Sequence, residues 1–255
     1  IIKSFATPRR LAITISKLQS KQQDQVIDKK GPSTKSPEMA INGFAQSCGV
    51  SVSKLEKKEL GGKEYFFYSK EEPGQNIKNL LPAIIEKSIK DIPITRAMKW
   101  GDSEYSFVRP VHWLVLMLDK DIVNANIMGL ESGRVSQGLR FQEASLNFSH
   151  ANEYEKAMKD KAKILVDFRK RKELIRSQIL SVATTKNAEV VIDETLLDEV
   201  CALVEYPMAF CGSFDEKFLD IPQEAIISAM KSHQKYFHLV DSKNNLLPLF
   251  ISVAN

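Results

Sequence analysis

An arginine and a histidine lie close together in residues 106–113 (SFVRPVHW), directly before a strongly apolar run at residues 114–118. That run has the length and composition of a buried strand. Pro110 lacks a backbone N–H and therefore favours the start or the edge of a strand. We expect Arg109 at the rim of a sheet, where its charge can face a ligand. Because Arg109 and His112 are three residues apart in an extended segment, their side chains should point to opposite faces.

A structural role is the alternative for both side chains. Arg109 can form a buried ion pair, for which Glu205 is a candidate partner. His112, next to Trp113, can be a core histidine whose ring nitrogens are hydrogen-bonded. The pattern alone leaves both alternatives open.

Two adjacent arginines, Arg9 and Arg10, follow Pro8 at the entrance to a predicted strand. Guanidinium groups bind phosphate through two parallel hydrogen bonds, so a pair of them on a rigid corner predicts contact with an RNA backbone. The alternative is a bridge to a carboxylate within the fold. Of the two, Arg9 is the expected structural partner.

His233, Lys235 and Tyr236 come directly after a predicted helix, at the entry to a strand. A loop with these residue types can hold a phosphate and stack on an unpaired base, or it can be a plain hinge. Two charge clusters, Lys29-Lys30 and residues 169–172 (RKRK), are expected to be solvated faces. If they contact RNA instead, each neutralised phosphate should add about one unit to the salt dependence of binding.

Predicted helices and strands that position these side chains follow one another without regular alternation. Apolar spacing and end signals predict helices at residues 37–44 (ending near 49), a short one from 51, and others at 76–90, 152–158, 168–184, 194–205 and 222–231. Strands are expected at residues 11–16, 64–68, 108–118, 122–130, 236–240 and 247–253, with a hairpin turn at residues 119–121. Residues 19–37 are polar with a loop signal, and residues 141–150 are expected to be irregular. Non-alternating strands and helices predict an α+β fold with mixed or antiparallel sheets and packed helices.

Composition permits a substantial core and sets limits on the class of protein. The chain has 255 residues, 43% of them hydrophobic, and a formal net charge of +4, which is compatible with a nucleic-acid partner. Its three cysteines are scattered without a CxxC pair, as expected for reduced thiols in a cytosolic protein. The longest apolar run is too short to span a bilayer, and no signal peptide is visible. The sequence also contains no glycine-rich phosphate loop and no nucleophile elbow.

Several short motifs occur in a fixed order along the whole chain. They are residues 5–13 (FATPRRLAI), 31–33 (GPS), 98–101 (MKWG), 106–113, 138–141 (GLRF), 203–207 (LVEYP), 233–237 (HQKYF) and 250–255 (FISVAN). Taken together, they resemble the β subunit of the bacterial two-subunit glycyl-tRNA synthetase. The resemblance implies a fold similar to the editing-type domain of the phenylalanyl-tRNA synthetase β subunit. The family usually has a histidine where this chain has Leu139, which weakens any acid–base role for that segment.

The resemblance also implies a division of labour. Glycine activation, with ATP and Mg²⁺, would belong to a separate α subunit in an α2β2 assembly, and this chain would position glycine tRNA in the cytoplasm, with no membrane or DNA partner. It would bind no cofactor and contain no catalytic residue or metal ligand of its own. The candidate RNA contacts are Arg9, Arg10, Lys29, Lys30, Lys99, Arg109, His112, Arg140, His233, Lys235 and Tyr236.

We expect a fragment cut at both ends, because the chain begins at Ile1 within a predicted strand. Its front part, residues 1–165, would position tRNA. Residues 166–255 would supply a helical connector and closing strands, either as a separate part or within the same domain.

Two other functions are alternatives to tRNA positioning. One is a hydrolytic proofreading domain that removes mischarged amino acids, which rests on fold analogy alone. The other is a scaffold for the α subunit that touches no RNA, to which exposed side chains around Met98, Trp100 and Phe107 would be suited.

Overall fold

The computed structural model describes residues 1–140 and 145–255, and these form two compact units. One unit is residues 18–92, and the other combines residues 1–17 with residues 93–255. Both contain helices and antiparallel strands, so the predicted α+β class is confirmed. The division expected between residues 165 and 166 stays a prediction. In the described part of the chain, no helix combines the length and apolarity that crossing a bilayer requires.

The unit of residues 18–92 is a small sheet with a helix on one face. Its strands are ordered β3–β5–β4, and the long central strand pairs antiparallel with both neighbours. The elements are β3 (Gln25–Ser33), α1 (Glu38–Ser47), the 3-10 helix η1 (Val52–Lys54), β4 (Glu56–Leu60), β5 (Lys63–Glu72) and α2 (Ile77–Lys90). A three-residue core of Ala45, Leu55 and Phe66 joins the helix to the sheet.

The strand β3 differs from the sequence prediction, in which the polar residues 19–37 favour a loop. Its side chains from Gln25 to Lys30 are all exposed, so the strand lacks the apolar alternation by which a half-buried strand is recognised. Backbone pairing with β5, from Gln25 opposite Glu72 to Ser33 opposite Tyr65, holds it in place.

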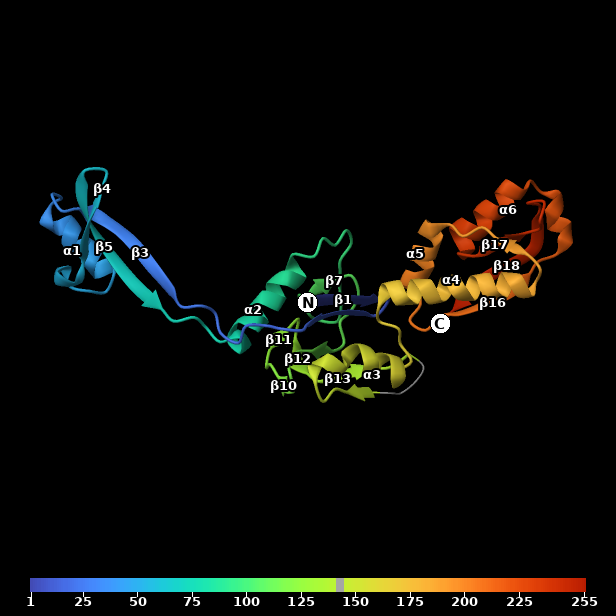
Figure 1. Ribbon diagram of the computed structural model, residues 1–255, viewed down its shortest axis with the longest axis horizontal. Coiled ribbons are helices and arrows are strands. Elements are labelled where there is room, and N and C mark those ends of the chain that lie inside the picture. The colour runs from blue at the N-terminus through green and yellow to red at the C-terminus, as the bar shows by residue number, and fades with distance from the viewer. Residues whose placement is uncertain (141–144) are drawn as a thin grey trace. The chain divides into compact units, whose positions relative to one another are not determined.

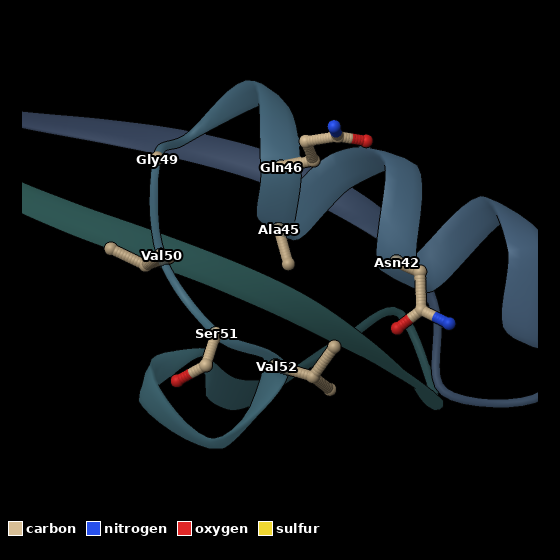
Figure 2. Close-up of a pocket in the computed structure, with 7 residues that line it drawn as sticks. All are labelled: Asn42, Ala45, Gln46, Gly49, Val50, Ser51 and Val52. Carbon is tan, nitrogen blue, oxygen red and sulfur yellow. The ribbon is translucent and has the colours of Figure 1, made fainter.

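A shallow hollow of about 500 Å³ lies on the helix side of this unit. Figure 2 shows its lining, which comes from the end of α1, the turn at Gly49 and the start of η1. Gly49 has a φ of 69°, a left-handed conformation that suits glycine and that ends the helix. A second hollow is lined by residues around Asn124 and Ser132. Neither hollow is lined by a predicted RNA contact.

Position 31 has no room for a side chain larger than that of glycine. A Cβ atom at Gly31 would overlap the ring of Phe44, which packs against the core. Gly31→Val is therefore expected to destabilise this unit by about 1–3 kcal/mol, as overpacking does. Hydrogen exchange of the amides in β3 and β5 measures this locally.

Gly43 supplies the matched control, because it lies within α1 and a Cβ there would meet nothing within 4 Å. Gly43→Ala should leave exchange unchanged or slow it, since alanine favours the helix. Equal protection in Gly31→Val and the unmodified chain would contradict the packing argument.

The first part of the larger unit is built from short strands around one cluster. The elements are β1 (Ile2–Thr7), β2 (Arg10–Ile15), β6 (Met98–Lys99), β7 (Ser106–Phe107), β8 (Leu114–Val115), β9 (Met117–Leu118), β10 (Asp121–Ile122), β11 (Asn126–Ile127), β12 (Leu130–Gly133), β13 (Val135–Gln137), β14 (Ser145–Asn147), the 3-10 helix η2 (Ala151–Glu153) and α3 (Tyr154–Asp160). Phe5, Phe148, Met158 and Ile164 lie at the centre of the cluster.

The continuous strands expected at 108–118 and 122–130 are wrong in extent. Residues 108–113 form no strand, and β8 pairs in parallel with β12 while β9 pairs antiparallel with β10. The predicted turn at residues 119–121 is confirmed, with Asp119 at a φ of 53°. Within residues expected to be irregular, β14 pairs with β13, while residues 141–144 lie outside the described part.

The second part of the larger unit is a four-stranded antiparallel sheet, ordered β15–β17–β18–β16, with helices packed on it. Figure 1 shows α4 lying along β16 and β18. The elements are α4 (Phe168–Thr185), β15 (Glu189–Val190), α5 (Glu194–Leu203), β16 (Met208–Ser213), the 3-10 helix η3 (Glu216–Asp220), α6 (Gln223–Ala229), the π-helical turn η4 (Met230–Gln234), β17 (Phe237–Val240) and β18 (Leu246–Ala254).

The helices predicted at residues 168–184, 194–205 and 222–231 are confirmed as α4, α5 and α6. Capping residues and apolar spacing explain why α4 and α5 form there. Asp167 and Asp193 accept hydrogen bonds from the backbone N–H groups of Lys170 and Leu196, at 3.1 and 3.0 Å, and so begin α4 and α5. Ile175 and Ile179 of α4 meet Phe237, Leu239 and Ile251 in the core of the sheet.

Candidate nucleic-acid interface

Arg10 is buried at the centre of a polar cluster beneath the turn between β1 and β2. Its side chain is 3% exposed, and its guanidinium group forms an ion pair with Glu205, whose side chain is 1% exposed. Its Nη2 also donates to the carbonyl oxygens of Gln137 and Gly138, at 2.6 and 2.9 Å. The prediction that Arg10 contacts RNA is therefore wrong, because the charge it carries is turned inward.

Glu205 and its neighbour Tyr206 form further hydrogen bonds that connect separate parts of the chain. The Thr7 hydroxyl donates to its Oε1 at 2.6 Å. The backbone N–H groups of Glu205 and Tyr206 both donate to Oδ1 of Asn255, at 2.8 and 2.9 Å. Four of the motifs in the sequence, at residues 5–13, 138–141, 203–207 and 250–255, thus meet in one structural cluster.

This cluster corrects two pairings expected from the sequence. Glu205 pairs with Arg10 and not with Arg109, which is exposed. Of the two adjacent arginines, Arg10 and not Arg9 is the structural one. Two buried atoms, Arg10 Nε and Glu205 Oε2, have no hydrogen-bond partner among the described residues.

Arg9, in contrast, is exposed at the turn and lies against an aromatic ring. Its guanidinium carbon is 6.0 Å from the ring centre of Trp113, and that of Arg10 is 5.5 Å from the same ring. Trp113 follows His112, which is exposed and is therefore not a core histidine. The buried pair anchors a rim where Arg9 and His112 both face solvent.

Arg140 and Lys99 are also exposed cations of the larger unit. Lys99 forms an exposed ion pair with Glu104 at 2.5 Å. Leu139 packs against the apolar cluster around Phe148. Phe141, the last residue of that motif, lies outside the described residues.

The segment with His233, Lys235 and Tyr236 is held tightly in the structure. Lys235 adopts a left-handed conformation, with φ at 58°, and its Nζ lies 2.7 Å from Glu199 and 3.0 Å from the Ser232 carbonyl oxygen. The Tyr236 ring stacks on Phe250, with ring centres 4.2 Å apart and planes at 10°. One face of the tyrosine is therefore already covered, while His233 is exposed.

The RKRK cluster at residues 169–172 is not the uniform solvated face that the sequence predicts. Arg171 is fully buried and donates to the carbonyl oxygens of Cys201, Leu165 and Ala6. Lys172 reaches Glu194 and Asp198 on α5, at 3.0 and 2.5 Å. Hydrogen bonds from Arg176 and Lys172 lower the pKa of Glu194 to about 2. These charges serve to pack α4 against its neighbours.

Lys29 and Lys30 are exposed on β3 of the unit of residues 18–92. The Nζ of Lys30 lies 4.0 Å from the ring centre of Tyr65. The motif patterns do not single out that tyrosine as a site residue. A signal is nevertheless present, since residues 63–68 (KEYFFY) place four aromatic side chains near a lysine in one strand.

Each of the two units carries exposed cations near aromatic rings. Among the residues that the structure describes, no three His, Cys, Asp or Glu side chains group as a metal site would need. The exposed members of the candidate set are Arg9, Lys99, Arg109, His112, Arg140 and His233 in the larger unit, and Lys29 and Lys30 in the unit of residues 18–92. Exposed cations and aromatic rings can bind a polyanion by charge and by stacking.

Comparison with known proteins agrees with the motif order. The family model described as glycyl-tRNA synthetase beta subunit matches residues 1–255. The "Glycine--tRNA ligase beta subunit" of Chromohalobacter salexigens is 45% identical over 99% of this chain, and that of Marinobacter nauticus is 41% identical over all of it. In both cases the chain spans 38% of the relative's length. The chain belongs to the family of glycyl-tRNA synthetase β subunits.

Proposed function

We propose that this chain is the part of a glycine–tRNA ligase β subunit that positions glycine tRNA and supports the catalytic α subunit. The complete enzyme would join glycine to its tRNA with conversion of ATP to AMP and diphosphate, in the cytoplasm, as an α2β2 assembly. ATP and Mg²⁺ would be used through the α subunit. The curated relatives bear the name of this subunit, and their similarity extends over nearly the whole chain.

The observation that carries the tRNA-positioning role is the exposed rim above the buried Arg10–Glu205 pair. The pair anchors the chain at Arg10, next to Arg9, whose guanidinium carbon lies 6.0 Å from the ring centre of Trp113. A cation on anchored backbone loses less entropy when it binds a phosphate than one on a mobile loop does. Orienting an acceptor strand in this way contributes to aminoacylation by positioning and not by proton transfer.

Filter binding of glycine tRNA to the assembled enzyme tests this role. Arg9→Ala combined with His233→Ala is expected to weaken binding about tenfold and to reduce the salt slope by about one unit for each phosphate that the variant no longer binds. Lys159→Ala, which removes an exposed cation from α3, serves as the control and should change neither quantity. Unchanged affinity and salt dependence in the Arg9 and His233 variant would contradict the assignment.

A role as scaffold is a second candidate, and exposed apolar side chains near β6 and β7 favour it. Met98 is 49% exposed, and its strand partner Phe107 is half-buried. Ultraviolet crosslinking of the assembled enzyme to tRNA separates the two candidates. A scaffold that touches no RNA would give no adduct within residues 1–255.

A deacylation assay with mischarged tRNA tests the proofreading alternative in the same preparation.

A further inference from the structure

The outer face of the β3–β5–β4 sheet carries two aromatic rings side by side on its central strand. Side chains alternate between the two faces of a strand. Phe66 and Tyr68 belong to the core beneath α1, so Tyr65 and Phe67 lie on the face away from that helix. Both rings are half-buried, which means that part of each ring is open to solvent.

Lysines from both edge strands reach over these two rings. Lys30 of β3 lies opposite Phe67, and its Nζ is 4.0 Å from the ring centre of Tyr65. Lys58 of β4 lies opposite Tyr65, and its Nζ is 5.6 Å from the ring centre of Phe67. By the same alternation, Lys63 shares this face.

Carboxylates on the same face are few near the rings. Glu56, opposite Phe67, lies 3.1 Å from Lys58, but both side chains are about half exposed, so water screens the pair and it breaks at little cost. Asp28 and Glu71 lie farther along the strands, opposite Ser69 and Val26. The face is therefore cationic around Tyr65 and Phe67 and becomes acidic toward the far end of β5.

The spacing of the rings selects the form of nucleic acid. Two residues along a strand are separated by about 7 Å. Stacked bases in a duplex follow one another at about 3.4 Å, so the rings match two bases that are spread apart. Unpaired RNA presents such bases, and aromatic side chains on a sheet are a known way to stack them.

We propose that Tyr65 and Phe67 form a stacking surface for two unpaired nucleotides of RNA, with Lys30 and Lys58 binding the flanking phosphates. This inference rests on the proposed function, because it assigns a new contact to the same RNA-binding subunit. It adds a site on residues 18–92, a unit separate from the one that holds Arg9 and His112.

The alternation of the strands supplies a matched control for the experiment. Lys57 of β4 and Lys70 of β5 lie on the helix side of the same sheet, because Lys57 is opposite Phe66 and Lys70 is two residues from Tyr68. The double variant Lys30→Ser and Lys58→Ser therefore removes the same charge as Lys57→Ser and Lys70→Ser, but from the opposite face. A third variant, Tyr65→Val with Phe67→Val, keeps residues that favour strands and removes the rings.

Binding is measured with the assembled enzyme by fluorescence anisotropy, using a labelled single-stranded 12-nucleotide RNA, the same RNA in a duplex, and glycine tRNA. The ring variant is expected to bind the single strand about tenfold more weakly or worse. The Lys30 and Lys58 variant should lose about 1.4 units of salt slope on the single strand, the value for two phosphates, while the Lys57 and Lys70 variant keeps the slope. The duplex should bind more weakly than the single strand and respond little to removal of the rings.

Equal losses from the two lysine pairs would overturn the proposal, because they would show a general charge effect. Equal affinity for single strand and duplex would overturn it as well. If the ring variant fails to fold, the exposed lysine pairs still decide the matter. Loss of tRNA binding in the Arg9 and His233 variant, with none in the sheet variants, would remove this site and leave the proposed function standing. Absence of any tRNA binding by the assembled enzyme would remove the proposed function itself.

Discussion

Glu205→Ala is expected to lower the free energy of unfolding by about 3–5 kcal/mol, the cost of leaving a buried charge unpaired. The Arg10 guanidinium would remain in a site where its side chain is 3% exposed, and the Thr7 hydroxyl would lose its acceptor. Urea unfolding followed by tryptophan fluorescence measures the change. Both tryptophans, Trp100 and Trp113, belong to the larger unit, so the signal reports the unit that contains the pair.

A double variant and an exposed ion pair serve as controls for Glu205→Ala. Arg10→Met combined with Glu205→Leu removes both charges and should recover much of the loss, because an apolar pair of similar volume is often as stable as a buried ion pair. Lys170→Ala, which breaks the exposed pair with Glu155, should cost no more than about 1 kcal/mol. If Glu205→Ala costs as little as Lys170→Ala, the pair does not anchor the corner, and Arg10 is available for another role.

Arg171→Leu is expected to cost about 3 kcal/mol or more, because three carbonyl oxygens lose the donor that satisfies them. They belong to Cys201, Leu165 and Ala6, so the change also loosens the packing of α4 against α5 and β1. Cys201 lies in the last turn of α5, where the partial negative charge of the helix end favours a cation. The same fluorescence-detected unfolding measures the loss.

Arg169 is the matched control, since it lies two residues away on α4 and is exposed. Arg169→Leu should change the free energy of unfolding by no more than about 0.5 kcal/mol. Arg171→Lys keeps the charge but lacks the planar set of donors, so it should recover only part of the loss. A small effect of Arg171→Leu on stability, together with weaker tRNA binding, would instead favour a role for Arg171 in binding RNA.

Both predictions concern residues whose charge, in the sequence, suggests a ligand. Arg10 and Arg171 have the residue type of an RNA contact, and both occur beside other cations. Their neighbours Arg9 and Arg169 are exposed and have the same side chain. Local sequence cannot tell which arginine of each pair is buried, because burial depends on a carboxylate or carbonyl group in a segment that is distant in the chain.

Local sequence also predicts some of the helices and strands and misses others. The helices α2, α4 and α5 are predicted within a few residues, because their apolar spacing and their capping residues act over one or two turns. The strand β3 and the break at residues 108–113 are not predicted. A strand with exposed side chains on both faces depends on a partner strand for its hydrogen bonds, and β5 begins thirty residues after β3 ends.

The sequence by itself determined the family, the α+β class and the residue types available to bind a polyanion. These follow from the order of short motifs and from local periodicity, which folding does not alter. Only the tertiary structure decided that Arg10 and Arg171 face inward, that Glu205 pairs with Arg10, and that Lys30 and Lys58 lie over Tyr65 and Phe67. These facts depend on strand register and on residues up to 195 positions apart in the chain, and the free energy of a charge depends on what surrounds it in space.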